Sequence, residues 1–422
     1  MANWTTLPAE VADEIAAHNS NDLPTLRSMC LASKAIREAA VEHLFSVILF
    51  ACVEDLDYWM DILQRTPQLR ASVKTVRLSA GEMNNNRRGP NSASTPLVNA
   101  PTVPQLPAFR GAKTVECRSF RGPDAIAFIA SYMVLFPNMR ELRLHYLTED
   151  EGGVRISRLL ASCPPLQSLV LDWVFAYPSQ SPSNAAHPSP FKSADFDWTC
   201  LEKLAIIGGT EYGMEYLQDL VAKFPPSTLK SLHFRGSANE RRGDGGGERA
   251  YYPAMETLLR KAAPRLEHLR LDPSFGVRNG MWFDTNGPTQ SFNTMFSILP
   301  TFPELTTISL EIRINLQVPF VLSQIAAPKL ETIALQINLD SRRENHVEEY
   351  VPEALSKLAS LERNGGEGVD RALLRRFPAL KRITIDFFAN RMSRVHFKRR
   401  MRHRIEGDRE FHTQGSGCRG GI

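Results

Sequence analysis

The sequence predicts an α/β solenoid, in which short parallel strands line the inner face and helices lie outside. Two observations carry this prediction. A six-residue apolar pattern recurs along most of the chain, and an apolar, helix-like segment followed by proline precedes most of its copies. A unit of this kind cannot bury its apolar face alone, so neighbouring units must stack. A stack can accommodate all 422 residues without one large core.

The repeated pattern is apolar, two variable residues, apolar, one variable residue, apolar. Its eight clear copies begin at Met139, Leu166, Leu201, Leu229, Leu266, Leu305, Leu330 and Leu380. Successive copies begin 27, 35, 28, 37, 39, 25 and 50 residues apart. A weaker copy begins at Val73, and a degenerate one surrounds Val115. Because the last two apolar positions alternate with period two, each copy predicts a short strand with one buried face.

Apolar segments that end at a proline precede six of these strands. They span residues 129–136, 156–163, 217–224, 255–263, 320–327 and 372–377. Proline lacks an N–H group and disfavours helical geometry in the residue before it, so each segment is predicted to be a helix that ends there. An open α/β sheet, which also alternates helices and strands, is the alternative.

Composition divides the chain into three parts. Residues 1–50 form a helical module, residues 51–390 the solenoid, and residues 391–422 a basic tail. Four long insertions in the solenoid are poor in apolar residues and are expected to be surface loops: 81–108, 178–195, 236–250 and 276–292. Such loops either form a binding rim or are insertions without a role.

The positive charge is concentrated in the tail. The net charge is +4, and residues 391–404 hold seven Lys or Arg and no acid, which leaves 4 − 7 = −3 for the rest. The body therefore does not indicate a nucleic-acid-binding protein. The tail fits either a solvated basic helix that closes the solenoid or a nuclear-localisation or nucleic-acid-binding arm. Neither a secretory signal nor an apolar run long enough to span a membrane is visible, so we expect a cytoplasmic or nuclear protein.

No motif of a known catalytic or metal site is visible. The six cysteines form no CxxC pair and are expected to be free, buried thiols, and the ten histidines form no HExxH motif. GxSxG, GxGxxG and P-loop patterns are also missing. We therefore expect no catalytic residue, no metal and no cofactor. An enzyme of unrecognised type would need a pocket with converging acids or histidines.

The first 50 residues predict three short helices. Pro8 stands where the first helix would begin, and Val11 and Ile15 lie one turn apart on one of its faces. Asp22 is placed to cap the second helix, and Ser33 to cap the third. Three helices of this size form only a small core, which gains much from a partner.

This module resembles the F-box. The resemblance rests on Leu7-Pro8-Ala9-Glu10-Val11, Asp22-Leu23-Pro24-Thr25-Leu26, Cys30-Leu31-Ala32-Ser33-Lys34 and Leu44-Phe45. In that family the helices dock on the Skp-type adaptor of a cullin–RING ubiquitin ligase. The adaptor-facing residues that the resemblance implies are Leu7, Pro8, Val11, Ile15, Leu23, Leu26 and Leu31. Any of them also suits the internal core of the helices. Many F-boxes have a tryptophan near the place of Ile36.

The repeated pattern resembles leucine-rich repeats over residues 55–390. That family usually places Asn or Cys three residues after the last apolar position, and here Asn338 alone does so. The solenoid is therefore expected to be irregular. Target contacts are expected at the variable strand positions of the concave face: Arg143, Val170, Ala205, His233, Arg270, Ser309, Ala334 and Thr384.

The two resemblances together imply a substrate-recognition subunit of a Skp–cullin–F-box ubiquitin ligase. Its partners would be the Skp-type adaptor, a cullin ligase reached through it, and a target protein that the sequence does not identify. Catalysis would belong to other subunits. The alternative is a non-catalytic repeat scaffold for protein–protein interaction that does not engage the ligase and whose first helices are only a cap.

Overall fold

The computed structural model describes residues 8–20, 22–80, 97, 108–120, 123–149, 154–176, 197–208, 221, 228–235, 256–272, 301–313, 322, 325–339, 375–389, 398–405 and 411–413. The chain forms two compact units, Met1–Cys200 (unit 1) and Leu201–Ile422 (unit 2). Each unit is described by itself. The predicted loops at 178–195, 236–250 and 276–292 and most of 81–108 lie outside the described residues.

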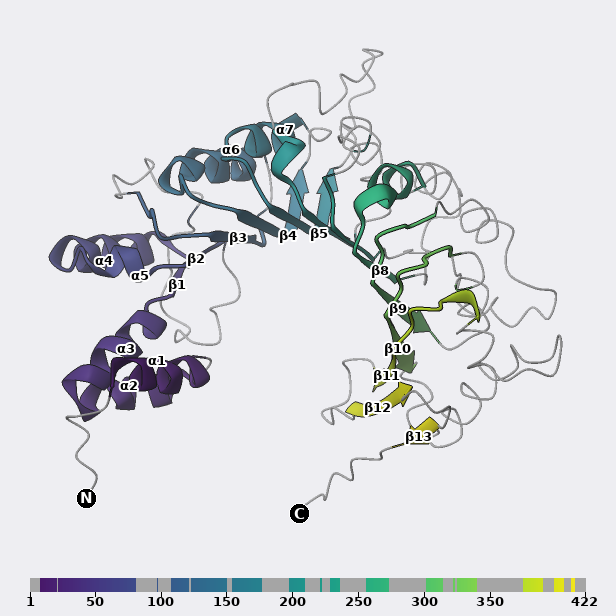
Figure 1. The fold of residues 1–422 in the computed structure, drawn as a ribbon. Coiled ribbons are helices and arrows are strands. Elements are labelled where there is room, and N and C mark those ends of the chain that lie inside the picture. Colours follow the sequence, from purple (N-terminus) through teal and green to yellow (C-terminus); the bar gives the residue numbers. More distant parts are fainter. Residues whose placement is uncertain are drawn as a thin grey trace, which may run out of the picture. The chain divides into compact units, whose positions relative to one another are not determined.

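Three helices open unit 1 (Figure 1): α1 (Ala9–His18), α2 (Leu23–Ala32) and α3 (Lys34–Leu44). Both predicted caps are confirmed. The Thr25 backbone N–H donates to Asp22 Oδ1 at 3.2 Å, and the Ile36 N–H donates to Ser33 Oγ at 3.3 Å. Each cap satisfies an N–H group that the first helical turn leaves without a partner.

These helices share a core of their own. Its buried members are Ala12, Ala16, Leu26, Ile36, Ala39 and Ala40, with Met29, Cys30 and Leu44 packed against them. Four of the six buried residues are alanines, so the core holds little apolar side-chain volume. A module with so small a core has a small margin of stability.

In the described part of unit 1, five parallel strands form the sheet, and they follow one another in chain order. They are β1 (Val47–Phe50), β2 (Thr75–Ser79), β3 (Thr114–Arg118), β4 (Glu141–Glu149) and β5 (Ser168–Ala176). The weak and the degenerate copies thus form β2 and β3, as predicted. Strand β1 pairs with β2, so the sheet begins inside the segment 1–50 that the sequence assigns to the helical module.

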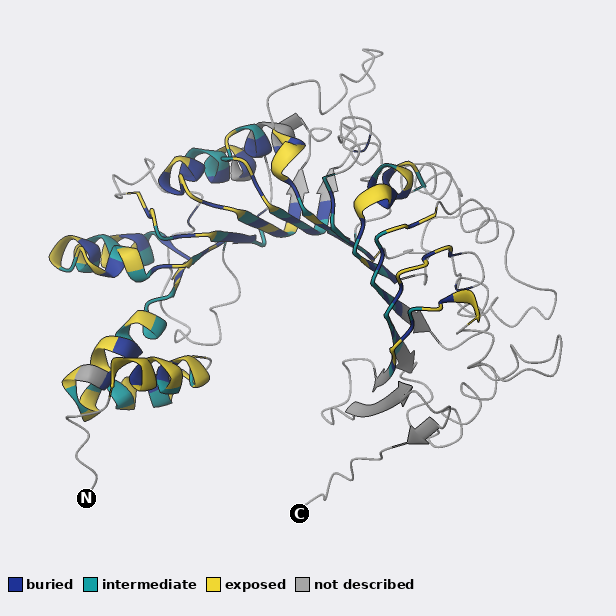
Figure 2. Ribbon diagram, in the orientation of Figure 1, coloured by how far each residue is buried: buried dark blue, intermediate teal, exposed yellow. Residues whose placement is uncertain are grey.

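The remaining helices of unit 1 connect successive strands. They are α4 (Val53–Arg65), α5 (Leu69–Ser72), α6 (Pro123–Tyr132), the 3₁₀ turn η3 (Met133–Leu135), α7 (Val154–Ala161) and the 3₁₀ turn η4 (Trp198–Cys200). Figure 1 shows α4, α6 and α7 along one side of the sheet. In Figure 2 the strands are largely buried, whereas α4 exposes much of its surface.

One backbone feature repeats at the start of the strands. The Ser46 carbonyl accepts from the N–H groups of both Lys74 and Thr75, each at 2.9 Å, and the Lys74 carbonyl accepts from Lys113 and Thr114. The same double acceptance recurs at Lys113, Arg140, Glu202, Lys230, Glu267, Thr306 and Glu331. It fixes the register between neighbours, and a slip of one residue would turn every buried side chain outward.

Unit 2 has the same plan, with six parallel strands among its described residues. They are β6 (Lys203–Ile207), β7 (Ser231–Arg235), β8 (His268–Asp272), β9 (Thr307–Arg313), β10 (Thr332–Leu339) and β11 (Arg382–Ala389). Two antiparallel strands follow, β12 (Lys398–Ile405) and β13 (Phe411–Thr413). The prediction of a basic helix in the tail is therefore wrong, because its basic segment pairs with β11 as a strand.

In unit 2, two helices end at other residues than the sequence predicts. Pro264 does not end its helix abruptly, because it lies inside the 3₁₀ turn η5 (Ala263–Arg265). The last three residues of the predicted helix 320–327 are not helical: Ala326 forms a β-bridge with Thr301, and its carbonyl accepts from the Phe302 N–H at 2.8 Å. The predicted helix 217–224 lies outside the described residues except for Val221.

Candidate binding surfaces

The side of the unit 1 sheet away from α6 and α7 displays side chains in register. One row across the strands is Leu49, Arg77, Glu116, Arg143 and Val170. The next row is Ser79, Arg118, His145 and Asp172. Because side chains alternate along a strand, both rows point to the side opposite the buried apolar residues. The predicted contact positions Arg143 and Val170 are thus direct neighbours on this face.

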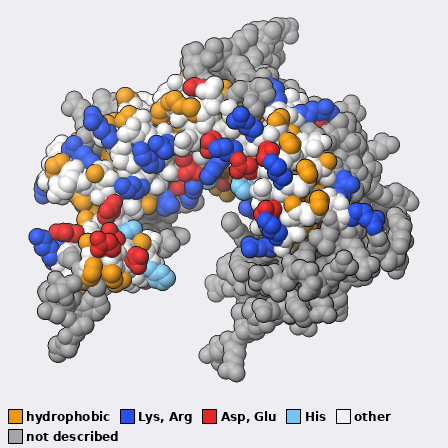
Figure 3. Space-filling view, viewed as in Figure 1, with side chains coloured by type: hydrophobic (Ala, Val, Ile, Leu, Met, Phe, Trp, Pro, Cys, Tyr) orange, Lys and Arg blue, Asp and Glu red, His pale blue; other side chains and the backbone are white. Residues whose placement is uncertain are grey.

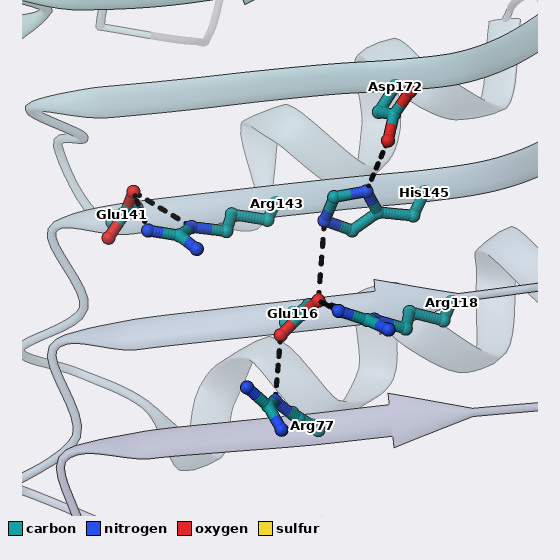
Figure 4. A network of polar contacts seen from close by, with 7 residues as sticks. All are labelled: Arg77, Glu116, Arg118, Glu141, Arg143, His145 and Asp172. Atoms are coloured by element: carbon teal, nitrogen blue, oxygen red, sulfur yellow. Dashed lines mark hydrogen bonds and ion pairs between the residues drawn. The ribbon is translucent and has the colours of Figure 1, made fainter. Parts of the chain in front are cut away.

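A buried carboxylate lies at the centre of the face (Figure 4). The Glu116 side chain is 3% exposed. Arg77 Nε donates to its Oε2 at 2.9 Å, and Arg118 Nε donates to its Oε1. His145 Nε2 lies 3.4 Å from the same Oε1. Three residues from three adjacent strands therefore converge on one acid.

The pKa of Glu116 reflects two opposing effects. Burial disfavours the charged carboxylate and by itself would raise the pKa. The hydrogen bond from Arg118 and the charges of Arg118, Arg77 and His145 outweigh it, so the pKa of Glu116 is lowered. The carboxylate is therefore charged at neutral pH and holds its arginines in place.

Two further contacts extend the network across β4 and β5. His145 Nδ1 lies 2.8 Å from Asp172 Oδ2, and Arg143 Nε donates to Glu141 Oε1 at 3.0 Å. The carboxylates in this network are 3–24% exposed, whereas the side chains of Arg77, Arg118 and Arg143 are 39–45% exposed. The face thus presents guanidinium groups to solvent above acids that hold them. Figure 3 shows acidic and basic side chains gathered along the sheet.

Aromatic residues occupy a strained position beside the network. Tyr146 and Trp173 have φ of 54° and 55°, as Ser119 does at 60° in the preceding copy. Left-handed backbone is uncommon for bulky residues and costs of the order of 1 kcal/mol. The two rings stack with centroids 6.3 Å apart, and Tyr146 is 47% exposed. The two residues directly follow His145 and Asp172 of the polar network along their strands.

The residue after each left-handed position, Tyr146 or Trp173, departs from the usual leucine-rich-repeat pattern. The next residues, Leu147 and Val174, are buried. They occupy the position at which leucine-rich repeats usually carry Asn or Cys. In unit 2, Gly208 has φ of 74° at the position that matches Tyr146. In the copies of β4 and β5, buried aliphatic side chains therefore stand where the family usually has Asn or Cys.

The predicted contact residues of unit 2 also form one row. Ala205, His233, Arg270, Ser309, Ala334 and Thr384 pair in register from β6 to β11. All are half-buried. Arg270 Nη2 donates to Gln336 Oε1 at 2.8 Å, which ties β8 to β10. Their role in target binding stays a prediction.

The N-terminal helices expose part of the predicted adaptor surface. Leu31 is 83% exposed and Val11 is 40% exposed. Pro8 is exposed as well, and Ile15 is half-buried. Leu26 is fully buried in the helical core, so its assignment to the adaptor surface is corrected to a structural role. The side chains of Leu7 and Leu23 lie outside the described residues.

Burial opposes ionisation of two of the described cysteines. All five described cysteines are free, as predicted, but only Cys52 and Cys117 are buried, whereas Cys30 and Cys163 are half-buried and Cys200 is exposed. Burial raises the pKa of Cys117 and raises that of Cys163 to about 12. Neither thiol is therefore an activated nucleophile at neutral pH. Among the described residues no group of three or more His, Cys, Asp or Glu could hold a metal ion.

The face residues that sequence reasoning missed are Arg77, Glu116, Arg118, His145 and Asp172. The two-residue alternation of a strand was the signal available in the sequence, because the residue after the last apolar position points outward like the residue before it.

No helix of the described segments is long and apolar enough to cross a membrane.

Comparisons with known proteins find a distant likeness among solved structures. No family model matches the sequence, and no curated protein matches it. Among solved structures, the chain is similar to the leucine-rich repeat-containing protein LegL7 from Legionella pneumophila, with a TM-score of 0.36 and 13% identity. The match covers 75% of this chain and 84% of that chain. A likeness of this extent assigns neither a family nor a function.

Proposed function

We propose that this chain is a non-catalytic binding protein with two working surfaces. Its sheet face binds a target protein, and its N-terminal helices bind the Skp-type adaptor of a cullin–RING ubiquitin ligase, as an F-box does. The observation that carries the proposal is the separation of these surfaces. The helices pack around a core of their own, while the rows on the sheet face expose arginines, and the Tyr146–Trp173 pair directly follows His145 and Asp172 of the second row.

Exposed apolar side chains support adaptor binding by the helices. Leu31 exposes 83% of its surface at the end of α2, and Val11 exposes 40% on α1. Full burial of a leucine side chain at an interface contributes about 1.5–3 kcal/mol. A partner that covers both residues would also stabilise a module whose own core is small.

The mechanism under this proposal is proximity. One chain that holds the target and the adaptor at once raises the effective concentration of the target near the ligase. Ubiquitin transfer itself belongs to the other subunits. The chain therefore needs no catalytic residue, but it needs both surfaces to be occupied together.

Replacing Leu31 by aspartate is expected to weaken binding of the full chain to a purified Skp-type adaptor by about tenfold or more, because an apolar contact becomes a desolvated charge. Val11→Asp should act in the same direction. Calorimetric titration of the full chain measures both effects. Val134→Asp is the matched control, since Val134 is 72% exposed in η3 of the same unit and should leave the affinity unchanged. Equal losses in all three variants, or no binding by the wild-type chain, would contradict the proposal.

A second candidate function has its own support. Only Phe45 and Ser46 separate α3 from β1, the Ser46 carbonyl accepts from β2, and Lys74 Nζ lies 3.6 Å from Glu42 Oε1. Ile36, in the place where many F-boxes have tryptophan, is buried in the helical core. These contacts fit helices that only cap the first strand of a repeat scaffold. Absence of adaptor binding by the folded full chain would favour this function.

A further inference from the structure

Three exposed cations stand at the same position of three successive repeats. Lys74, Lys113 and Arg140 each follow the first apolar residue of their copy and form what we call the cation row. The backbone holds them side by side, because the Lys113 N–H donates to the Lys74 carbonyl and the Arg140 N–H donates to the Lys113 carbonyl, each at 2.8 Å. Neighbouring strands lie about 4.8 Å apart, so the backbone positions of the three cations follow one another at that step.

Like charges on adjacent strands repel, and little in the described part of the chain offsets the repulsion. Lys74 Nζ lies 3.6 Å from Glu42 Oε1, but among the described residues Lys113 and Arg140 have no ion pair. The nearest acids in the sequence, Glu116 and Glu141, are held by arginines of the sheet face.

Unit 2 shows that the fold does not require this pattern. The same position there carries Glu202, Lys230, Glu267, Thr306, Glu331 and Lys381. Opposite charges on adjacent strands pair, with Lys230 Nζ 2.8 Å from Glu202 Oε1 and Lys381 Nζ 2.7 Å from Glu331 Oε1. The hydrogen bond from Lys230 to Glu202 and the charge of Glu202 raise the pKa of Lys230. Only unit 1 places three cations in succession.

The local charge balance agrees with this contrast. Residues 74–79, 113–118 and 140–149 hold six Lys or Arg and three Glu, which gives 6 − 3 = +3 with histidine neutral. The chain outside residues 391–404 carries 4 − 7 = −3 in total. Strands β2 to β4 are therefore a positive region in an otherwise slightly acidic body, and they attract an acidic partner.

We propose that the cation row is the docking site for an acidic helix of the target protein. A helix rises about 1.5 Å per residue, so acids three or four residues apart recur every 4.5–6 Å or so, close to the strand spacing. Glu42 illustrates the geometry within the chain, because it reaches Lys74 from helix α3. The inference rests on the proposal that the sheet of unit 1 binds a target protein, and it names the chemistry of that target.

The test uses the full chain and a synthetic helical peptide of Ala and Glu, with Glu spaced four residues apart. The double variant Lys113→Gln/Arg140→Gln is expected to bind the peptide about tenfold more weakly than the wild type, and added salt should weaken wild-type binding. The matched control Lys230→Gln/Lys381→Gln removes the same charge at the same repeat position in unit 2 and should bind like the wild type. Fluorescence anisotropy of the labelled peptide measures both.

Three results would overturn the inference. They are equal losses in the two double variants, equal binding of a peptide with Gln in place of Glu, and binding of a single-stranded oligonucleotide without binding of the Glu peptide. The last result would assign the row to nucleic acid. Adaptor binding is measured separately through Leu31→Asp, so peptide binding without adaptor binding would reject the ligase proposal and leave this inference standing.

Discussion

Replacing Leu26 by aspartate is expected to unfold the N-terminal helices. Leu26 is fully buried among residues of which four are alanines, and no described residue of that core could pair with a charge. An unpaired carboxylate there costs more than about 4 kcal/mol, which exceeds what so small a core supplies. Circular dichroism of residues 1–50, and hydrogen exchange of the same residues in the full chain, would show the loss.

Leu31→Asp is the matched control for this result. Leu31 lies on the same helix as Leu26 but is 83% exposed, so the same substitution should change the unfolding free energy by less than about 0.5 kcal/mol. The pair separates folding from binding: Leu26→Asp removes both, and Leu31→Asp weakens adaptor binding alone. A folded Leu26→Asp module would contradict the core described for α1, α2 and α3.

Glu116→Gln is expected to lower the unfolding free energy of the chain by about 2 kcal/mol. The amide keeps the size of the side chain, but it loses the charge and places N–H donors against the donors of Arg77 and Arg118. Urea unfolding measures the change through the midpoint at constant slope. Glu42→Gln removes an exposed carboxylate 3.6 Å from Lys74 and should cost less than about 0.5 kcal/mol. Equal effects of the two variants would contradict a central role for Glu116.

The effect of Glu116 also has a defined pH dependence. Its pKa in the folded chain is lowered from the ordinary value of 4.5, so folding favours the charged carboxylate. Its stabilisation is complete above pH 4.5 and is lost as the pH falls through the lowered folded-state pKa. The difference between wild type and Glu116→Gln should therefore be larger at about pH 7 than at about pH 3. A gap that widens with acid would contradict the ion-pair account.

The strands were predictable because a local pattern encodes them. Two apolar residues with one outward residue between them suffice to define a strand, and even the degenerate copy at Val115 forms β3. Strand β1 was missed because Val47–Phe50 is four apolar residues in a row directly after a helix, with no six-residue pattern to mark it. The basic tail segment was also misassigned, since pairing with β11 is a tertiary effect.

The site was less predictable than the fold. Period two identifies outward positions such as Arg143, but not that Glu116 would be almost fully buried among arginines of neighbouring strands. That burial depends on the register between repeats. In the same way, helical spacing could not separate Leu26, which faces the core, from Leu31, which faces solvent. The left-handed backbone at Tyr146 and Trp173 had no sequence signal, because glycine is the residue that usually marks it.

Hydrogen exchange of the full chain with and without a purified Skp-type adaptor tests the division of labour between the two surfaces most directly. The account predicts adaptor-induced protection in peptides from residues 8–44 and unchanged exchange in peptides that cover β2 to β5. Protection of the strands with none in the helices, or no protection at saturating adaptor, would contradict it and leave a repeat scaffold whose first helices only cap the sheet.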